Sequence, residues 1–215
     1  MAASRKRVDW KTEWTRYLVP VRISPGFWLA PADSEVHGEG RVIRYRPALA
    51  FGDGGHPTTR LASRELERLC GSGRFRELLD VGSGTGVLAF VALLSGVERA
   101  FGTDVWPDAL VAARENAALN GVAQRFSVCE PDALAPRPFE LIVANLEAPV
   151  LLENAERIAS YAEKGTRVLV TGFLDERREE VRSRFGALGF NEENALSEEG
   201  WSLLELQLAG VAAQG

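Results

Sequence analysis

The chain has 215 residues, 46% hydrophobic and 26% charged, which is the composition of one soluble domain with a single sizeable core. Acidic residues outnumber basic ones by 30 to 25, and the net charge of -5 excludes a global positive field for holding a nucleic-acid backbone. Two cysteines, Cys70 and Cys129, are too few for a zinc site or a disulfide framework, so we expect reduced thiols and no metal centre.

Residues 1–50 are expected to form an extension that packs on the rest of the chain. Aromatic residues at helical spacing predict a helix near the start, with one face for packing: Trp10, Trp14 and Tyr17. Two alternating apolar runs, 18–23 and 27–30, flank the turn signal Pro25-Gly26 and predict a hairpin. This extension is too short for an independent domain, which leaves residues 51–215 as the main domain.

Neither a membrane span nor a secretory signal can be read in the sequence. The longest apolar stretch, 87–94, is far short of the ~18 consecutive apolar residues needed to cross a bilayer. The basic start of the chain continues into Lys11, Glu13 and Arg16 instead of an apolar segment. We therefore expect a cytoplasmic protein with no membrane partner.

From residue 77 onward, short apolar strands alternate with helical segments. The predicted strands are 77–81, 99–105, 126–129, 139–144 and 166–171. The predicted helices are 85–95, 107–119, 150–161 and 175–188, and a further helix starts near Pro57. A series of this kind implies a parallel sheet covered by helices on both faces.

The chain ends in two strand-like runs that break this alternation. Runs 190–196 and 201–208 are joined by a short polar link into which no crossover helix fits, so they must pair as an antiparallel hairpin. Seven strands ending in such a hairpin are typical of the class I methyltransferase arrangement rather than of a plain dinucleotide-binding domain. We expect an α/β fold with a Rossmann-like, seven-stranded, mostly parallel sheet and a C-terminal antiparallel hairpin.

A glycine-rich turn follows the first strand of the series, in the segment LDVGSGTGVLA. Gly82, Gly84 and Gly86 lie between that strand and the next helix, where glycine allows unusual backbone angles and the close approach of a ligand. A dinucleotide fingerprint GxGxxG requires glycine where this chain has Val87, and no GxxxxGK[ST] motif is present. The GxGxG spacing is typical of S-adenosylmethionine sites, so the methionine end of that cofactor is expected against these glycines.

Acidic residues follow the next two strands. Asp104 closes its strand 22 residues after Gly82, where a carboxylate can accept hydrogen bonds from both ribose hydroxyls or simply cap the following helix. Such an acid serves NAD and S-adenosylmethionine equally. Asp132 is a candidate acceptor for the adenine amino group or an ordinary turn residue, and Trp106 is a candidate wall of the adenine site or a packing residue.

Two further motifs flank these features, AFGDGGHPTTRLA at 50–62 and VANLEAP at 143–149. Together with the glycine turn and GTDVWPDAL, they lie in order and with suitable spacing. On these four segments the chain resembles the PrmA-type methyltransferases, which methylate large-subunit ribosomal protein eleven, over residues 10–208. The resemblance implies S-adenosyl-L-methionine as the cofactor, and it carries cofactor-binding roles over to four residues: Thr59, Gly82, Asp104 and Asn145.

The residues of these motifs suit such roles. Thr58 and Thr59 fall in the first turn of a predicted helix, where hydroxyls and free N–H groups can meet the methionine carboxylate or merely cap the helix. His56 is expected to order the preceding loop rather than to act as a base. Asn145 ends a buried strand, where a polar amide is expected to have a hydrogen-bond partner or a functional role. Asn145 and Glu147 are the catalytic candidates, because they are the groups expected to orient an incoming amine.

Three departures from the family pattern bear on the substrate. Asp53 stands where the family has threonine, Glu-Ala-Pro follows Asn145-Leu146, and the family's separate N-terminal substrate-recognition domain is expected to be absent. The expected methyl acceptor is therefore a protein amine, lysine or N-terminal, of a ribosomal or another protein, or else a small amine. The protein itself is expected to be a monomer or a small homo-oligomer.

Three alternatives stay open. Nucleic-acid methyltransferases commonly have an aromatic residue shortly after the Asn at this strand end, whereas this chain continues Leu146-Glu147-Ala148 and is acidic. An NAD-dependent oxidoreductase is opposed by Val87 and by the terminal hairpin. A protein that binds S-adenosylmethionine as part of an assembly, without catalysis, would keep the fold and lose turnover.

Overall fold

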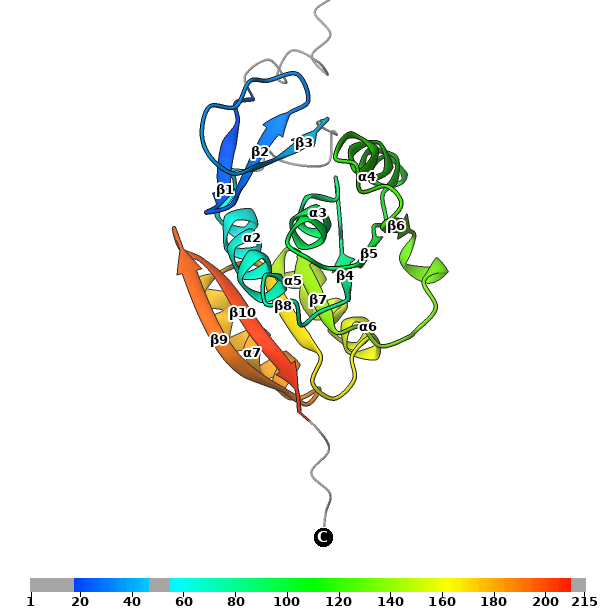
Figure 1. Ribbon diagram of the computed structural model, residues 1–215. Helices are drawn as coiled ribbons and strands as arrows, with labels where there is room; N and C mark the ends of the chain where they lie inside the picture. The colour runs from blue at the N-terminus through cyan, green and yellow to red at the C-terminus, as the bar shows by residue number, and fades with distance from the viewer. Residues whose placement is uncertain (1–17, 47–54, 210–215) are drawn as a thin grey trace, which may run out of the picture.

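The computed structural model describes residues 18–46 and 55–209, which form two β-sheets and the helices packed against them (Figure 1). The predicted helix with Trp10, Trp14 and Tyr17 lies outside the described residues. Within them, no helix is long and apolar enough to span a membrane, and no group of three His, Cys, Asp or Glu side chains is arranged to hold a metal ion. Both cysteines are free thiols, and burial raises the pKa of Cys70 to about 12.

The larger sheet has seven strands, whose order is β6-β5-β4-β7-β8-β10-β9. The strands are β4 (Glu77–Val81), β5 (Arg99–Thr103), β6 (Phe126–Cys129), β7 (Leu141–Asn145), β8 (Arg167–Leu174), β9 (Phe190–Glu198) and β10 (Trp201–Leu208). The first five are parallel, while β10 runs antiparallel to both β8 and β9. The predicted seven-stranded, mostly parallel sheet with a terminal hairpin is confirmed.

Helices cover both faces of this sheet (Figure 1). One face carries α2 (Pro57–Cys70), α3 (Val87–Leu94) and α4 (Pro107–Leu119), and the other carries α5 (Ala148–Glu153), α6 (Ala155–Ser160) and α7 (Arg178–Gly186). Short 3-10 turns lie at η2 (Pro131–Ala133) and η3 (Asp175–Arg177). Successive strand residues point to opposite faces, so Leu78 joins one apolar core and Leu79 the other. The two cores hold the sheet rigid beneath its carboxyl edge.

The single helix predicted over 150–161 is instead two short helices. Asn154 separates α5 from α6, with φ -90° and ψ 1°, which is outside the helical range. Its side-chain amide donates to the carbonyl of Val150 at 2.8 Å. The backbone N–H of Asn154 donates to the same carbonyl at 3.0 Å, so the break between α5 and α6 lies in the backbone angles of Asn154 and not in a lost hydrogen bond.

The smaller sheet covers the helices of the first face. The two predicted apolar runs form β1 (Val21–Ser24) and β2 (Phe27–Pro31), which pair antiparallel, and β3 (Arg41–Tyr45) lies parallel to β2. Asn120, at the end of α4, accepts from the N–H of Arg44 at 2.8 Å and donates to its carbonyl at 2.7 Å. The Asn120 side chain therefore satisfies the backbone groups of Arg44 as a neighbouring strand would, and it connects the small sheet to α4.

Replacing Glu205 with glutamine should lower the free energy of unfolding by on the order of 3 kcal/mol, because it breaks a buried ion pair. The Glu205 side chain is 4% exposed, and its two oxygens lie 2.5 Å from an Nη of Arg68 and 2.6 Å from an Nη of Arg167. Glu193→Gln is the matched control, since that carboxylate is 36% exposed and 3.5 Å from Arg167, and its loss should cost less than about 1 kcal/mol. Urea unfolding of the two variants checks this, and equal losses would contradict it.

Candidate functional site

The carboxyl ends of the parallel strands form one edge of the large sheet, and the first turn of α2 lies at that edge. Strand β8 ends at Leu174, which pairs with Trp201 of β10. The ring of His56, the residue before α2, is centred 4.5 Å from the Trp201 ring. Thr58 and Thr59 are therefore brought to the edge at which the glycine turn and the end of β7 also lie.

The glycine turn after β4 has a backbone that only glycine adopts readily. The φ angles are 72° at Gly82, 53° at Gly84 and 87° at Gly86. The Gly82 N–H donates to the carbonyl of Thr103 at 2.8 Å, which fixes the turn to the end of β5. A Cβ on Gly82 would lie 2.4 Å from Cδ2 of Leu146, so any side chain there would push against the segment that follows β7.

Asp104 joins the glycine turn to the start of α4. The residue is 8% exposed, and one carboxylate oxygen accepts the Gly84 N–H at 2.8 Å while the other accepts the Trp106 N–H at 2.9 Å. This bond goes to the N-cap residue itself and not to the free N–H groups in the first turn of α4, so it is not the helix cap considered as the alternative role for Asp104. The Trp106 side chain itself is 64% exposed.

A hollow of about 260 Å³ opens next to Val105, the residue that follows Asp104. Its lining comes from the segments that follow β5 and β6, η2 included, and from the start of α6 with the residue before it: Val105, Glu130, Pro131, Asp132, Asn154 and Arg157. Asp132 lies in η2, is largely exposed, and has its Oδ1 2.8 Å from a guanidinium nitrogen of Arg157. The carboxylate predicted as an adenine contact therefore borders the hollow but is already paired.

The two catalytic candidates follow one another at the end of β7. Asn145 is its last residue and is half-buried, and its side chain makes no hydrogen bond within residues 18–46 and 55–209. Glu147 is exposed, at the N-cap of α5, and its side chain does not cap that helix. Both polar groups are free to meet a substrate at the carboxyl edge.

Leu146 and Gly172 are part of this edge, and the sequence reasoning missed them. Gly172 in β8 has φ 100°, and a Cβ there would lie 2.2 Å from the carbonyl oxygen of Leu146. The Leu146 side chain in turn touches Gly82. The segment after β7 is thus clasped between two glycines, and the isolated Gly172 inside a strand pattern was the available signal for a close backbone approach.

The side chain of His56 caps the N-terminus of α2. Its Nδ1 accepts from the N–H of Thr58 at 3.4 Å and lies 2.8 Å from the Thr58 hydroxyl. The carbonyl of His56 accepts the N–H of Thr59 at 3.0 Å. The ordering role predicted for His56 fits these contacts, and they occupy the N–H groups that were expected to be free.

Asn116 supports the glycine turn from α4 and was also missed. It is fully buried, and its amide nitrogen donates to the carbonyl of Thr85 at 3.2 Å. Its amide oxygen accepts the N–H of Arg46 at 2.8 Å. An asparagine at a core position of an apolar helix was the signal, because buried amides are normally committed to hydrogen bonds.

Asp80 lies in β4, before the glycine turn, and the pKa of its carboxyl group determines an expected dependence of stability on pH. Burial raises the pKa of this carboxyl from 3.8 to about 7, opposed by a hydrogen bond from the Ala89 N–H and helped by the charge of Asp104. The folded chain therefore holds a proton that the unfolded chain releases, and stability falls as pH rises from about 4 to about 7. The loss should be on the order of a few kcal/mol.

The Asp80→Asn variant checks this expectation, because its side chain does not titrate. Urea unfolding at pH 5 and pH 8 should show a smaller loss of stability with rising pH in the variant than in the parent chain. The same pH dependence in both proteins would show that Asp80 does not titrate in this window.

Known proteins match the chain along nearly its whole length. The family model described as ribosomal protein L11 methyltransferase (PrmA) matches residues 2–209. The chain belongs to the PrmA family. Curated relatives include the ribosomal protein L11 methyltransferases of Geobacter sulfurreducens and Azotobacter vinelandii, each 40% identical, over 91% and 84% of this chain. The chain spans 65% and 62% of the lengths of these two PrmA proteins.

Solved structures agree with the PrmA assignment. The ribosomal protein L11 methylase of Lactobacillus delbrueckii subsp. bulgaricus has a TM-score of 0.77 and 25% identity, covering 89% of this chain and 100% of that one. An RNA methyltransferase from Salinibacter ruber, in complex with S-adenosyl-L-homocysteine, has a TM-score of 0.57 and 19% identity, covering 74% and 98%. The second likeness supports the fold alone. The predicted family and the class I methyltransferase fold are confirmed, while the roles of single residues stay predictions.

Proposed function

We propose that this PrmA-family chain is a methyltransferase that uses S-adenosyl-L-methionine to methylate a protein amine. One arrangement carries the proposal: three glycines with positive φ at the end of β4, beside the buried carboxylate of Asp104 at the end of β5. Open α/β sheets bind nucleoside cofactors at the carboxyl ends of their strands. The family match over residues 2–209 and the names of the relatives support methyl transfer as the reaction.

The described residues fit this cofactor. Each oxygen of Asp104 accepts one backbone N–H and keeps a second lone pair for a ribose hydroxyl. The hollow of about 260 Å³ that begins at Val105 has room for a planar base, and the exposed Trp106 ring belongs to the same segment. Gly84, whose φ is 53°, leaves the main chain beside Asp104 without a covering side chain.

In the proposed reaction, the main task of the protein is to hold the acceptor amine in line with the methyl group of the donor. When bound, S-adenosylmethionine supplies a methyl group on a positively charged sulfur, open to in-line displacement. Asn145 would accept an N–H of the amine at its side-chain oxygen, and Glu147 would be the second orienting group. A lysine amine with the ordinary pKa of ~10.4 is neutral only about once in a few thousand at pH 7. An amine next to a cation in an apolar pocket loses its proton more readily, so these residues need not include a dedicated base.

The proposed acceptor is an amine of a ribosomal protein. Relatives 40% identical to this chain are named ribosomal protein L11 methyltransferase, which supports that class of substrate. The net charge of -5 also favours a lysine-bearing partner over a nucleic acid. A small amine is the alternative acceptor, and the label experiment below separates the two.

Two measurements test the proposal. Calorimetry with S-adenosylmethionine and S-adenosylhomocysteine should show binding of both, and failure to bind either would refute the cofactor. Incubation with labelled methyl donor and either ribosomal protein L11 or cell extract should label protein, sensitive to protease and resistant to nuclease. Label confined to nuclease-sensitive or small-molecule material would refute the protein acceptor. Binding without any label would identify a non-catalytic binding protein.

A further inference from the structure

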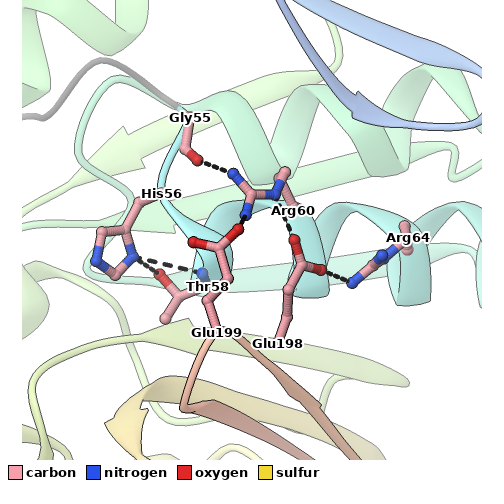
Figure 2. A network of polar contacts seen from close by, with 7 residues as sticks. All are labelled: Gly55, His56, Thr58, Arg60, Arg64, Glu198 and Glu199. Atoms are coloured by element: carbon pink, nitrogen blue, oxygen red, sulfur yellow. Dashed lines mark hydrogen bonds and ion pairs between the residues drawn. The ribbon is translucent and has the colours of Figure 1, made fainter.

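One network of ion pairs joins the first turns of α2 to the hairpin at the far end of the chain (Figure 2). Arg60 Nε lies 2.5 Å from an oxygen of Glu198, and its Nη2 lies 2.6 Å from an oxygen of Glu199. The remaining guanidinium nitrogen, Nη1, donates to the carbonyl of Gly55. Arg60 therefore bonds the β9–β10 turn and the backbone that enters α2 at the same time.

The pair of Arg60 with Glu198 is well shielded from water for an ion pair at the surface of a protein, whereas the Glu199 side chain is 67% exposed. The side chains of Arg60 and Glu198 are 22% and 21% exposed. Such pairs are screened by salt less than fully exposed ones. Arg64 also bonds Glu198 but is 42% exposed, and it reaches neither Gly55 nor Glu199.

The turn that carries Glu199 is strained. Glu199 has φ 51° and the next residue, Gly200, has φ 81°, which is the two-residue hairpin turn that favours Asn, Asp or Gly at both positions. Within residues 18–46 and 55–209, Glu199 is the one non-glycine residue with positive φ. A glycine would stabilise the turn better, so the glutamate is explained by its carboxylate, which Arg60 binds.

The same turn presents Trp201 to the residue that caps α2. The rings of Trp201 and His56 meet edge to face, 4.5 Å apart with a 73° interplanar angle. His56 in turn accepts from the Thr58 N–H. Arg60 thus closes a circuit of contacts from the hairpin turn through two rings to the first turn of α2.

We propose that Arg60 is a positioning residue for the methyl donor. By holding the hairpin turn and the Gly55 carbonyl together, it fixes the orientation of Thr58 and Thr59, which are the candidate contacts for the methionine end of the donor. The inference rests on the proposed function, because it names a residue that positions part of the proposed donor-binding site. Arg60 contacts neither donor nor acceptor in this scheme, and it acts through the groups that it joins.

Arg60→Gln, Arg60→Lys and the control Arg64→Gln test the inference by calorimetry with S-adenosylhomocysteine. The Arg60→Gln change should raise the Kd about tenfold, equivalent to ~1.4 kcal/mol. Arg60→Lys should recover only part of this, because an ammonium cannot bridge three acceptors in the fork geometry of a guanidinium. Arg64→Gln should leave the Kd within about twofold of the parent value. In the methylation assay, KM for the donor should rise more than kcat falls.

Glu199→Gly separates positioning from mere stabilisation. Because it relieves the positive φ, it should raise Tm by a few degrees at most, yet it should weaken donor binding because Arg60 loses one anchor. A purely structural role would move Tm and affinity in the same direction. If Arg60→Gln and Glu199→Gly bind as tightly as the parent chain, the inference is overturned. If the parent chain itself binds no donor, the proposed function has failed instead.

Discussion

Replacing Gly82 with alanine should nearly abolish donor binding. The backbone there has φ 72°, and the new Cβ would lie 2.4 Å from Cδ2 of Leu146. A left-handed backbone costs alanine roughly 1–2 kcal/mol, and Leu146 must move as well. That movement disturbs residues 145–147, which include both catalytic candidates. We expect the Kd for S-adenosylhomocysteine to rise about 100-fold, equivalent to ~2.7 kcal/mol.

Gly73→Ala provides the matched control for this prediction. Gly73 has φ 69°, nearly the same as Gly82, but a Cβ there would meet no heavy atom within 4 Å. The control should lose stability through backbone strain and keep the parent Kd. Calorimetry and urea unfolding of both variants separate the strain from the overlap with Leu146. Parent-like binding by Gly82→Ala would mean that the glycine turn is not the cofactor contact.

The position of the candidate site could be predicted because parallel strands end at a common edge. Once 77–81, 99–105 and 139–144 are recognised as parallel strands, the residues after them must be neighbours. Gly82, Asp104 and Asn145 are then expected together, and the structure has them at the ends of β4, β5 and β7. Local signals in the sequence are enough for such an inference, because the pairing of the strands supplies the long-range geometry.

Contacts between side chains from distant segments could not be predicted in the same way. Asp132 and Arg157 form their ion pair only because η2 and α6 meet beside the hollow. The clasp of Leu146 between Gly82 and Gly172 depends on the distances between three separate strand ends. No spacing within the sequence encodes the pair of Asp132 with Arg157, and the isolated Gly172 indicates a close backbone approach without naming its partner.

The strand β3 was missed for a local reason. Its sequence, RVIRY, has an arginine at two of five positions and no hairpin signal before it. It pairs parallel to β2 through a connection that contains no helix, whereas the usual parallel connection does. Its register is supported instead by Asn120, which bonds both backbone groups of Arg44.

Replacing Asn145 with alanine should leave the fold intact and remove most turnover. The side chain is half-buried and makes no hydrogen bond to another described residue, so the fold loses little with it. Its oxygen is the acceptor proposed to hold the amine in line with the transferred methyl group. Misalignment of a displacement costs about 100-fold in rate, and we expect a loss of kcat/KM of that size.

The measurement compares kcat/KM with the acceptor that the labelled extract identifies, alongside the melting curve and the Kd for S-adenosylhomocysteine. Asn191→Ala is the control, because that exposed residue of β9 pairs with Gln207, at the opposite edge of the sheet from the end of β7. It should retain turnover, since it lies away from the candidate site. An unchanged kcat/KM in Asn145→Ala would move the orienting role to Glu147, the remaining free polar group after β7.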